Sequence, residues 1–396
     1  MQSSEALADM NAREFQLLLC CAKAQPDSEN IRHLASGGIN WETLLRLAEQ
    51  HRVRPLLFRT FKSLCWDAVP PMRQLELETF YKANVVQNLF ATGELLRLLD
   101  AFRKEGITVA ALKGAVLAQV LYGDLSLREF VDLDLFVAET DLCKAEKVLT
   151  TCGYRTYYPG REYRSTFLSY YSQQVFFNSS GISVDLHWRL ASKHVAFPFQ
   201  SAEVFGRVRK ATIAGREIPT LADEDLAFFL AARGTKEGWI RLIWVCDFAE
   251  FLRTRLGIDW ATVLDLAQRA HSSGPLLLAI LLASALLDAP VPIELVDMAR
   301  NNSTVQALAR EAPFRMLRIA PEGDFDEFLN GLNTHDLMRH RLWAIVVLIM
   351  TRTVGDYEAM PLPKILWGMY YLTRPFRLAG RAVQMLLRNH RRQRTH

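Results

Sequence analysis

Several features common in secreted or membrane-spanning proteins are missing from this sequence. Its six cysteines are scattered without a C-x-x-C pair, which argues against zinc or disulfides and favours a reducing compartment. Met1–Asp9 has no basic segment followed by an apolar one, so a secretory signal is not expected. The longest apolar runs, Leu276–Leu287 and Leu342–Met350, are shorter than the roughly 20 residues that span a bilayer. We therefore expect a cytoplasmic protein.

Acidic residues are also missing from Ala359–His396, a segment that contains eight basic residues beside several aromatic ones. The basic residues are Lys364, Arg374, Arg377, Arg381, Arg388, Arg391, Arg392 and Arg394. They give this tail a charge of +8, and since the whole chain carries +4, the remainder carries −4. Such a helix can bind an anionic membrane surface, which would make the protein peripheral, and nucleic acid also selects clustered cations. The plainest alternative is a last packed helix with a basic end.

The remaining composition is that of a globular protein: half of the 396 residues are hydrophobic and 23% are charged. Apolar residues recur with a helical period up to about residue 104, and Asn40 is placed to cap a helix that begins at Trp41. We expect an α+β fold, in which a mixed β-sheet core at 105–200 lies between helical regions at 1–104 and 201–358. Residues 359–396 form the basic helix or tail.

The most informative strand is Asp132–Val137, which carries two carboxylates in an apolar, β-prone run. Side chains alternate along a strand, so Asp132 and Asp134 project from the same face about 7 Å apart. Two such carboxylates repel each other and resist burial, and a hard cation such as Mg²⁺ between them removes both costs. The alternative is a solvated face on an edge strand, and the pair alone favours that alternative.

The neighbouring segments change this balance. About eighteen residues upstream, Ala110–Leu112 leads into a Lys113-Gly114 turn and a helical pattern, and a helix that opens at a tight turn suits a phosphate. About fifty residues downstream, Ser183–Trp188 carries a third carboxylate, Asp185, and pairs in our prediction with Gln173–Phe177 across a short turn. The region from Tyr154 is aromatic and β-rich. Rings that could stack on a nucleobase, or equally belong to the core, are Tyr163, Tyr170, Tyr171, Phe176 and Phe177.

In this order, these segments resemble the nucleotidyltransferase superfamily of the polymerase-beta type. They resemble more closely a bacterial nucleotidyltransferase family with the pattern LKG…Y…R…DxDLxV…GY…VDLHW. The matching residues are Leu112-Lys113-Gly114, Tyr122, Arg128, Asp132–Val137, Gly153-Tyr154 and Val184–Trp188. The superfamily usually has Gly-Ser or Gly-Gly in the phosphate turn, so Ala115 after Lys113-Gly114 removes a hydroxyl that the lysine charge can replace. Arg233 stands where this family often has histidine, and we assign no catalysis there.

The resemblance implies that Asp132, Asp134 and Asp185 are the catalytic residues and hold Mg²⁺, with Mn²⁺ as an alternative. Two metal ions can hold the attacking and leaving oxygens in line, and Asp185 would complete the ion beside the nucleophile or accept its proton. Lys113, Gly114 and Arg128 are the predicted nucleotide-binding residues, although Arg128 could pair with Glu129 or Asp124 instead. Residues predicted to lie behind these are His187, Lys236 and Arg241. A core histidine and a solvated helix face are the alternatives for them.

The activity implied is transfer of a nucleoside monophosphate from an NTP such as ATP to an acceptor hydroxyl or phosphate, with release of pyrophosphate. A sugar, lipid-linked glycan, peptide or other small molecule would serve as acceptor, and a toxin that modifies tRNA is a variant of this hypothesis. Two hypotheses of other classes are a catalytically inactive nucleotide-binding regulator and a peripheral membrane or scaffold protein that acts through its basic tail.

Overall fold

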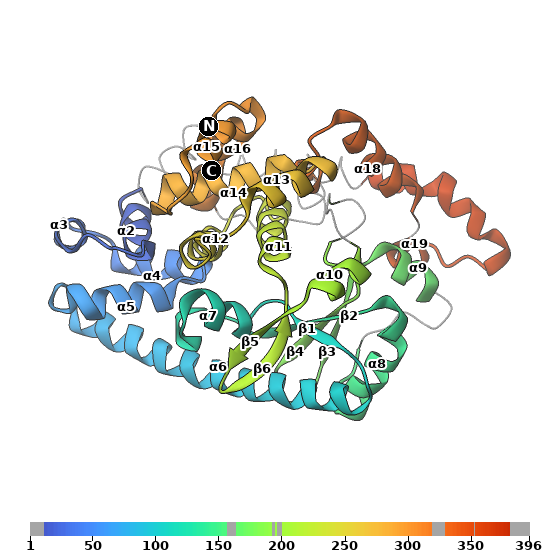
Figure 1. Cartoon of the computed structure of the whole chain (residues 1–396), viewed down its shortest axis with the longest axis horizontal. Helices are drawn as coiled ribbons and strands as arrows, with labels where there is room; N and C mark the ends of the chain where they lie inside the picture. Colours follow the sequence, from blue (N-terminus) through green and yellow to red (C-terminus); the bar gives the residue numbers. More distant parts are fainter. Residues whose placement is uncertain are drawn as a thin grey trace.

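The computed structural model describes residues 12–156, 164–191, 195, 200–318, 329–351 and 353–380. In this part of the chain, helices surround a six-stranded mixed sheet (Figure 1). The strands are β1 (Val109–Ala111), β2 (Asp132–Val137), β3 (Gln173–Phe177), β4 (Ser183–His187), β5 (Arg209–Ile213) and β6 (Arg216–Thr220), in the order β3-β4-β2-β1-β6-β5. The β2/β4 and β1/β6 pairs are parallel and the others antiparallel. The predicted α+β class is confirmed, as is the β3/β4 hairpin.

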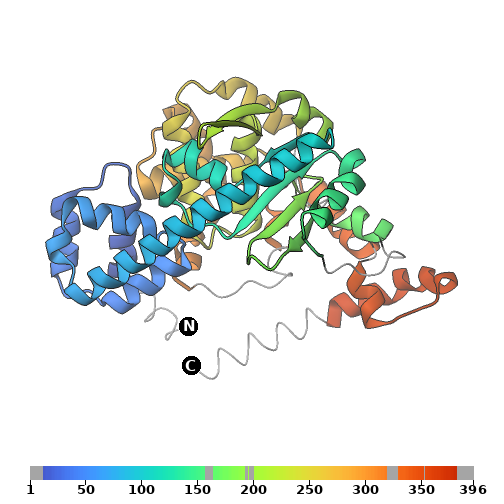
Figure 2. The ribbon, with the colours of Figure 1, turned by 90° about the horizontal axis from the view of Figure 1, so that it is seen from below.

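Helices occupy the described chain before the sheet, as predicted. They are α2 (Ala12–Ala22), α3 (Ser28–Ser36), α4 (Trp41–Gln50), α5 (Arg54–Leu64) and α6 (Pro71–Lys104). The side chain of Asn40 accepts a hydrogen bond from the Thr43 backbone N–H, which confirms the predicted cap of α4. Figures 1 and 2 show α2–α5 as a group at one end of the molecule, from which α6 runs along the sheet.

The alternation of side chains on β2 explains how the sheet is buried. Leu133, Leu135 and Val137 belong to one hydrophobic cluster with residues of α6 and of α8 (Leu142–Thr151). The side chains between them, including Asp132 and Asp134, project from the opposite face. That face is covered by helices from later in the chain (Figure 1), and it carries the polar residues discussed below.

Buried amides of α6 position the segment that leads into β2. Asn88 Nδ2 donates to the carbonyls of Leu125 (2.7 Å) and Arg128 (2.9 Å), and Asn84 Nδ2 donates to that of Ser126 (2.9 Å). Buried carbonyls need such partners because water does not reach them. The approach to the carboxylate-bearing strand is therefore fixed by a helix that is distant in the sequence.

Helices also dominate the chain after the sheet. Their bounds are α11 (Asp223–Lys236), α12 (Leu242–Thr254), α13 (Trp260–Arg269), α14 (Ser273–Leu287), α15 (Ile293–Arg300), α16 (Ser303–Arg318), α18 (Met338–Met350) and α19 (Val354–Ala359). Residues 370–380 are also helical. The apolar helix α14 is largely buried, as an all-round apolar pattern indicates. Among the helices described, none has the combination of length and hydropathy that crossing a bilayer requires.

The sheet differs from our expectation in two places. Strands β5 and β6 lie beyond residue 200, so the sheet extends into the region expected to be helical. They join through Ala214 and Gly215, which have φ angles of 49° and 75°. The sequence did not indicate this hairpin turn, because alanine seldom adopts a positive φ. In the segment expected to be β-rich, Arg164–Tyr170 instead forms the short helix α9, so Tyr170 is not on a strand.

Where the structure describes it, the basic tail agrees with the plainest alternative, a last packed helix. Arg374 and Arg377 both form ion pairs with the buried carboxylate of Asp356, so neither belongs to a freely solvated basic surface. Thr353 Oγ1 donates to the same carboxylate (2.9 Å). The side chain of Lys364 and the whole of Arg381, Arg388, Arg391, Arg392 and Arg394 lie outside the described residues.

His51 joins the N-terminal helices to α12. Its Nδ1 accepts a hydrogen bond from the Leu242 backbone N–H (3.1 Å), and its carbonyl accepts one from Ile243 (3.3 Å). The side chain is fully buried, as expected for a packed histidine. Burial, with a smaller contribution from the positive charge of Arg241, lowers the pKa of His51 to about 3.

We expect this histidine to make the fold sensitive to acid. Its folded-state pKa lies below the unfolded value of about 6.5, so between the two values only the unfolded chain binds the proton. The free energy of unfolding therefore decreases as the pH is lowered. From about pH 7 to about pH 5 this residue should remove about 2 kcal/mol from the free energy of unfolding. Denaturant titrations of wild type and His51→Asn, whose amide oxygen can replace Nδ1, should show a smaller loss in the variant. Equal losses would contradict the prediction.

Candidate active site

The three predicted carboxylates lie on one face of the sheet. Strand β2 pairs in parallel with β4, and Asp134 is in register with Asp185. Asp132 is in register with Ser183, two residues before Asp185, so all three carboxylates project from the same side. Phe136 is in register with His187, which places the histidine on this face as well. The structure therefore brings together Asp132, Asp134, Asp185 and His187.

Asp134 is the most buried of the three carboxylates and has two partners. It forms an ion pair with Lys113, and His187 Nε2 lies 3.0 Å from its Oδ1. Burial opposes ionisation, but the Lys113 ammonium and the hydrogen bond from His187 outweigh it and hold the pKa of Asp134 well below its usual range. Burial lowers the pKa of His187, although its bond to Asp134 opposes this shift. The two pKa shifts favour the charged form of the carboxylate and the neutral form of the imidazole.

Asp185 has a different environment. Its Oδ2 accepts a hydrogen bond from Gln173 Nε2 on the edge strand β3 (2.7 Å). Burial, together with the negative charges of Asp134 and Asp132, raises the pKa of Asp185 to about 6. A carboxylate held among like charges in this way gains from any cation that lies between them.

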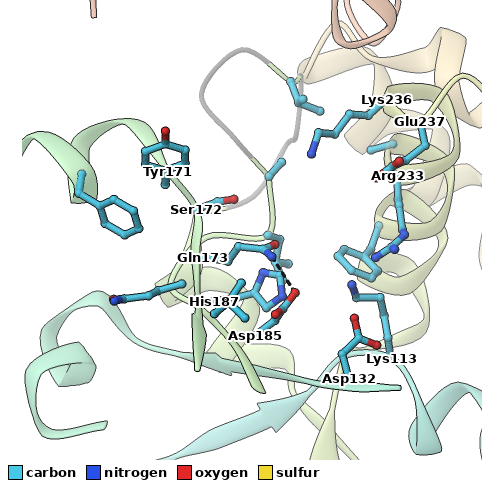
Figure 3. A pocket seen from close by; sticks show the side chains of 18 of the residues that line it. Lys113, Asp132, Tyr171, Ser172, Gln173, Asp185, His187, Arg233, Lys236 and Glu237 are labelled. Atoms are coloured by element: carbon cyan, nitrogen blue, oxygen red, sulfur yellow. Dashed lines mark hydrogen bonds between the residues drawn. The ribbon is translucent and has the colours of Figure 1, made fainter. Parts of the chain in front are cut away.

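Asp132 and Asp185 line a cavity of about 690 Å³ between the sheet and α11 (Figure 3), whereas Asp134 is buried beside them. On the α11 side its wall is formed by Arg233, Lys236 and Glu237, and Lys113 and Asp132 lie at the floor. The opposite wall comes from β3, β4 and the end of α9, including Tyr171 and Ser172. Basic side chains are thus gathered on one side of the carboxylates and aromatic and amide side chains on the other.

The donor atoms suit a divalent cation. Asp134, Asp185 and His187 each offer one ligand atom, and these three atoms lie within 4.8 Å of one another. Asp132, the third predicted ligand, lies two residues along β2 on the same face and lines the cavity. Carboxylate oxygens are preferred by Mg²⁺, and an added imidazole nitrogen is better tolerated by Mn²⁺. The residues present therefore fit the ion that the sequence predicts.

The Lys113-Gly114 turn lies directly beneath β2. Gly114 has a φ of 59°, and a Cβ added there would approach the Asp132 carbonyl oxygen and the Phe130 ring at 3.3 Å. A larger residue would be strained by its backbone and would press on the strand that carries the carboxylates. Helix α7 (Ala115–Tyr122) begins immediately after this turn. Lys113 lines the cavity, whereas Gly114 is buried behind it.

Arg128 is buried away from the cavity wall and is bound to Asp247 of α12. Its Nε and Nη2 donate to the two oxygens of Asp247 at 3.0 and 2.9 Å, and Tyr122 donates to the same carboxylate at 2.9 Å. Neither alternative surface partner is used, because Glu129 pairs with Arg54 and Asp124 accepts from Ser126. Although burial opposes it, the Asp247 carboxylate raises the pKa of Arg128.

The two basic residues predicted on the later helices are placed differently. Lys236, at the end of α11, lines the cavity. Arg241 precedes α12 beside His51, and its guanidinium lies 5.8 Å from the Trp244 ring. Arg233, to which the sequence assigned no catalytic role, lies one helical turn before Lys236 on the cavity side (Figure 3). Its i, i+3 spacing to Lys236 was the available signal.

The mixed sheet thus carries three carboxylates on adjacent strands, which face the basic last turn of α11. The chain belongs to the family described as "Uncharacterised nucleotidyltransferase", whose sequence model matches residues 37–288. This match confirms the resemblance and the enzyme class predicted from the sequence: the protein is a nucleotidyltransferase. A comparison with curated proteins finds no match.

Solved structures with some likeness are antibiotic-modifying enzymes. The lincosamide antibiotic adenylyltransferase LnuA, with lincomycin bound, is 22% identical with a TM-score of 0.25, over 34% of this chain and 84% of that one. The antibiotic-resistance factor ANT(2″)-Ia in solution is 12% identical (TM-score 0.33; 46% and 91% covered). In complex with adenylyl-2″-tobramycin it is 14% identical (TM-score 0.32; 46% and 98%). Likeness at this level carries no argument about substrate.

Proposed function

We propose that the protein transfers a nucleoside monophosphate from an NTP to an acceptor hydroxyl or phosphate, with dependence on Mg²⁺ or Mn²⁺ and release of pyrophosphate. The observation that supports this most directly is the parallel register of Asp134 with Asp185, which gathers three carboxylates on one face of the sheet, with Asp132 and Asp185 lining a cavity. The alternative of a solvated strand face does not describe Asp134, because this side chain is only 3% exposed. Its burial instead agrees with a site organised for charge.

The triphosphate is proposed to bind on the basic side of the cavity. Lys113, Arg233 and Lys236 line this side, and their charges match those of the phosphates. Gly114 contributes by allowing the turn beneath β2. Arg128 and Arg241 contribute through their positive charge, since Arg128 acts electrostatically on Asp132 and on the neighbouring Arg52. Arg233, which lines the cavity, thus joins the residues expected to stabilise bound nucleotide.

The acceptor is proposed to enter on the opposite side, next to Asp185. That wall carries Gln173, which orients Asp185, and the rings of Tyr171 and Phe177. Among the rings considered for stacking, these two line the cavity, whereas Phe176 is buried in the core and Tyr163 lies outside the described residues. Amides and aromatic rings suit a neutral acceptor such as a sugar, glycan, peptide or other small molecule.

In the proposed reaction the acceptor oxygen forms a bond to the α-phosphorus while the bond to the leaving pyrophosphate breaks. Asp185 lies on the acceptor side and is placed to accept the hydroxyl proton. Lys113, Arg233 and Lys236 hold the phosphates and balance the charge that develops on the leaving group. A divalent cation held by Asp132, Asp134 and Asp185, with His187 beside them, would supply further charge neutralisation when bound.

Label transfer tests this proposal. Purified protein is incubated with Mg²⁺ or Mn²⁺, each NTP labelled at the α-phosphate, beginning with ATP, and a bacterial lysate as acceptor source. We expect pyrophosphate release that matches the appearance of label in a product, both abolished by chelation. Release of inorganic phosphate without label transfer would indicate a hydrolase, and formation of labelled NDP without inorganic phosphate or pyrophosphate would indicate a kinase. Nucleotide binding without transfer to any fraction would favour the inactive regulator.

A further inference from the structure

Helix α18 presents an apolar face to solvent near the C-terminal end of the described chain. The exposed residues are Met338, Leu342, Trp343, Val346 and Met350. Their spacing of i, i+4, i+5, i+8 and i+12 places them along one side of the helix. Only Ala344 of this helix is fully buried, so most of its apolar surface is not used by the core.

A second apolar stripe follows. Leu372 and Phe376 are separated by four residues on the helix 370–380 and lie on one side of it, and Ile365 and Met369 belong to the 3₁₀ segment η5 (Lys364–Met369) that leads into this helix. Ile365, Leu372 and Phe376 are 91%, 70% and 81% exposed. Exposure of this extent at three apolar residues of one short segment is more than scattered surface apolar residues provide. We call the two stripes together the C-terminal apolar face.

The two helical segments are joined to each other. Arg374 Nε donates to the Leu348 carbonyl of α18 (2.9 Å), and the same guanidinium pairs with Asp356 and Thr353. Figures 1 and 2 show this part of the chain at the opposite end of the molecule from α2–α5. The apolar face is therefore carried by a connected unit rather than by separate loose segments.

The charge around this face selects its partner. From Leu337 onward the sequence contains eleven arginines and lysines and two acids, Asp356 and Glu358. Asp356 is buried and pairs with Arg374 and Arg377, so its negative charge is neutralised inside the protein, and nine cations and one acid remain. A second copy of this chain would bring basic segment against basic segment, which opposes self-association. Apolar stripes beside an excess of cations match an anionic bilayer surface, where the stripes enter the headgroup boundary.

We propose that the C-terminal apolar face docks the protein peripherally on membranes that contain anionic lipid. The contact is interfacial, in agreement with the lack of a spanning helix among those described. Residues that line the catalytic cavity belong to other elements, so the proposal does not depend on the nucleotidyltransferase chemistry. Nucleic acid would use the same cations but would gain little from Ile365, Leu372 or Phe376, and this difference makes the two partners separable.

Vesicle flotation of the full chain tests the proposal. We expect the protein to float with phosphatidylcholine vesicles that contain phosphatidylglycerol, to remain below with phosphatidylcholine alone, and to be released partly by salt. Leu372→Ser/Phe376→Ser should lower the vesicle affinity about tenfold, because two side chains that enter the bilayer are lost. Leu89→Ser/Phe90→Ser is the matched control, since both residues are exposed on α6, and it should float as wild type does.

Each alternative outcome overturns the proposal in a recognisable way. Failure of the wild type to float with anionic vesicles excludes lipid docking outright. Equal vesicle affinity of the two double variants would mean that the apolar side chains do not enter the bilayer and that charge alone holds the protein on the vesicle. The basic segment would then be expected to bind a polyanion such as RNA equally well. If Leu372→Ser/Phe376→Ser changes the oligomeric state in light scattering and the wild type does not float, the face is an interface between copies. Thermal unfolding of each variant verifies that it is folded.

Discussion

Asp185→Asn is expected to lower the rate of nucleotidyl transfer by about a thousandfold or more without loss of stability. The substitution keeps the shape of the side chain and leaves an oxygen that can accept from Gln173. It removes the charge proposed to bind the cation and to take the acceptor proton. Since the carboxylate lies among the like charges of Asp134 and Asp132, its neutralisation relieves repulsion in the free protein. Activity and stability should therefore separate.

Initial rates of label transfer and thermal unfolding should be measured on the same preparations. Asp141→Asn provides the control, because this carboxylate lies before α8 and its variant should transfer at the wild-type rate. The affinity for Mn²⁺, measured by calorimetry, should be lower in Asp185→Asn than in the wild type, and unchanged in Asp141→Asn. If that variant retains more than about a tenth of the activity, Asp185 does not take part in the chemistry.

The residues of the site that could be predicted from the sequence are those fixed by local patterns. Alternation along Asp132–Val137 placed both carboxylates on one face, and β-prone runs at Gln173–Phe177 and Ser183–His187 indicated the hairpin that carries Asp185. Each of these inferences needs only a period of two and a turn. The order of segments then supplied the family resemblance, which the family match confirms.

Other parts of the structure depend on partners that no local pattern reveals. Asp247 lies 119 residues from Arg128, and nothing in the period of α12 distinguishes it from a solvent-facing acid. The sequence after Ala359 contains no acid that could pair with Arg374 or Arg377. Their partner, Asp356, lies just before that segment. The assignment of nucleotide-binding and metal-binding residues, and the placing of domain boundaries, stay predictions.

The buried pair of Arg128 and Asp247 is expected to have a large effect on stability when either partner is removed. Both side chains are almost completely inaccessible, and Arg128 uses two nitrogens on the two carboxylate oxygens. Arg128→Met leaves a buried carboxylate with Tyr122 as its remaining donor, and Asp247→Asn leaves a buried guanidinium without its counter-charge. An unpaired buried charge costs about 3–5 kcal/mol, so each single variant should lose that much in denaturant unfolding.

The double variant Arg128→Met/Asp247→Asn should be more stable than either single variant. It contains no unpaired charge, and the new amide can still accept from the Tyr122 hydroxyl. Since the double variant should lose less than either single variant, the coupling energy from this cycle should exceed about 3 kcal/mol, the smallest loss expected for a single variant. Strictly additive losses would contradict the assignment of the ion pair as the cause, and would point to packing around each side chain instead.

The same double variant separates the structural role of Arg128 from its proposed role in nucleotide binding. Arg128 reaches the site through its charge, which acts on Asp132 across the short segment between η2 (Leu125–Leu127) and β2. If that charge helps to hold the triphosphate, the folded double variant should show a severalfold higher KM for the NTP, by about 1 kcal/mol of lost binding, with kcat little changed. An unchanged KM would assign Arg128 wholly to the fold, because the pair can then be removed without any effect on the nucleotide.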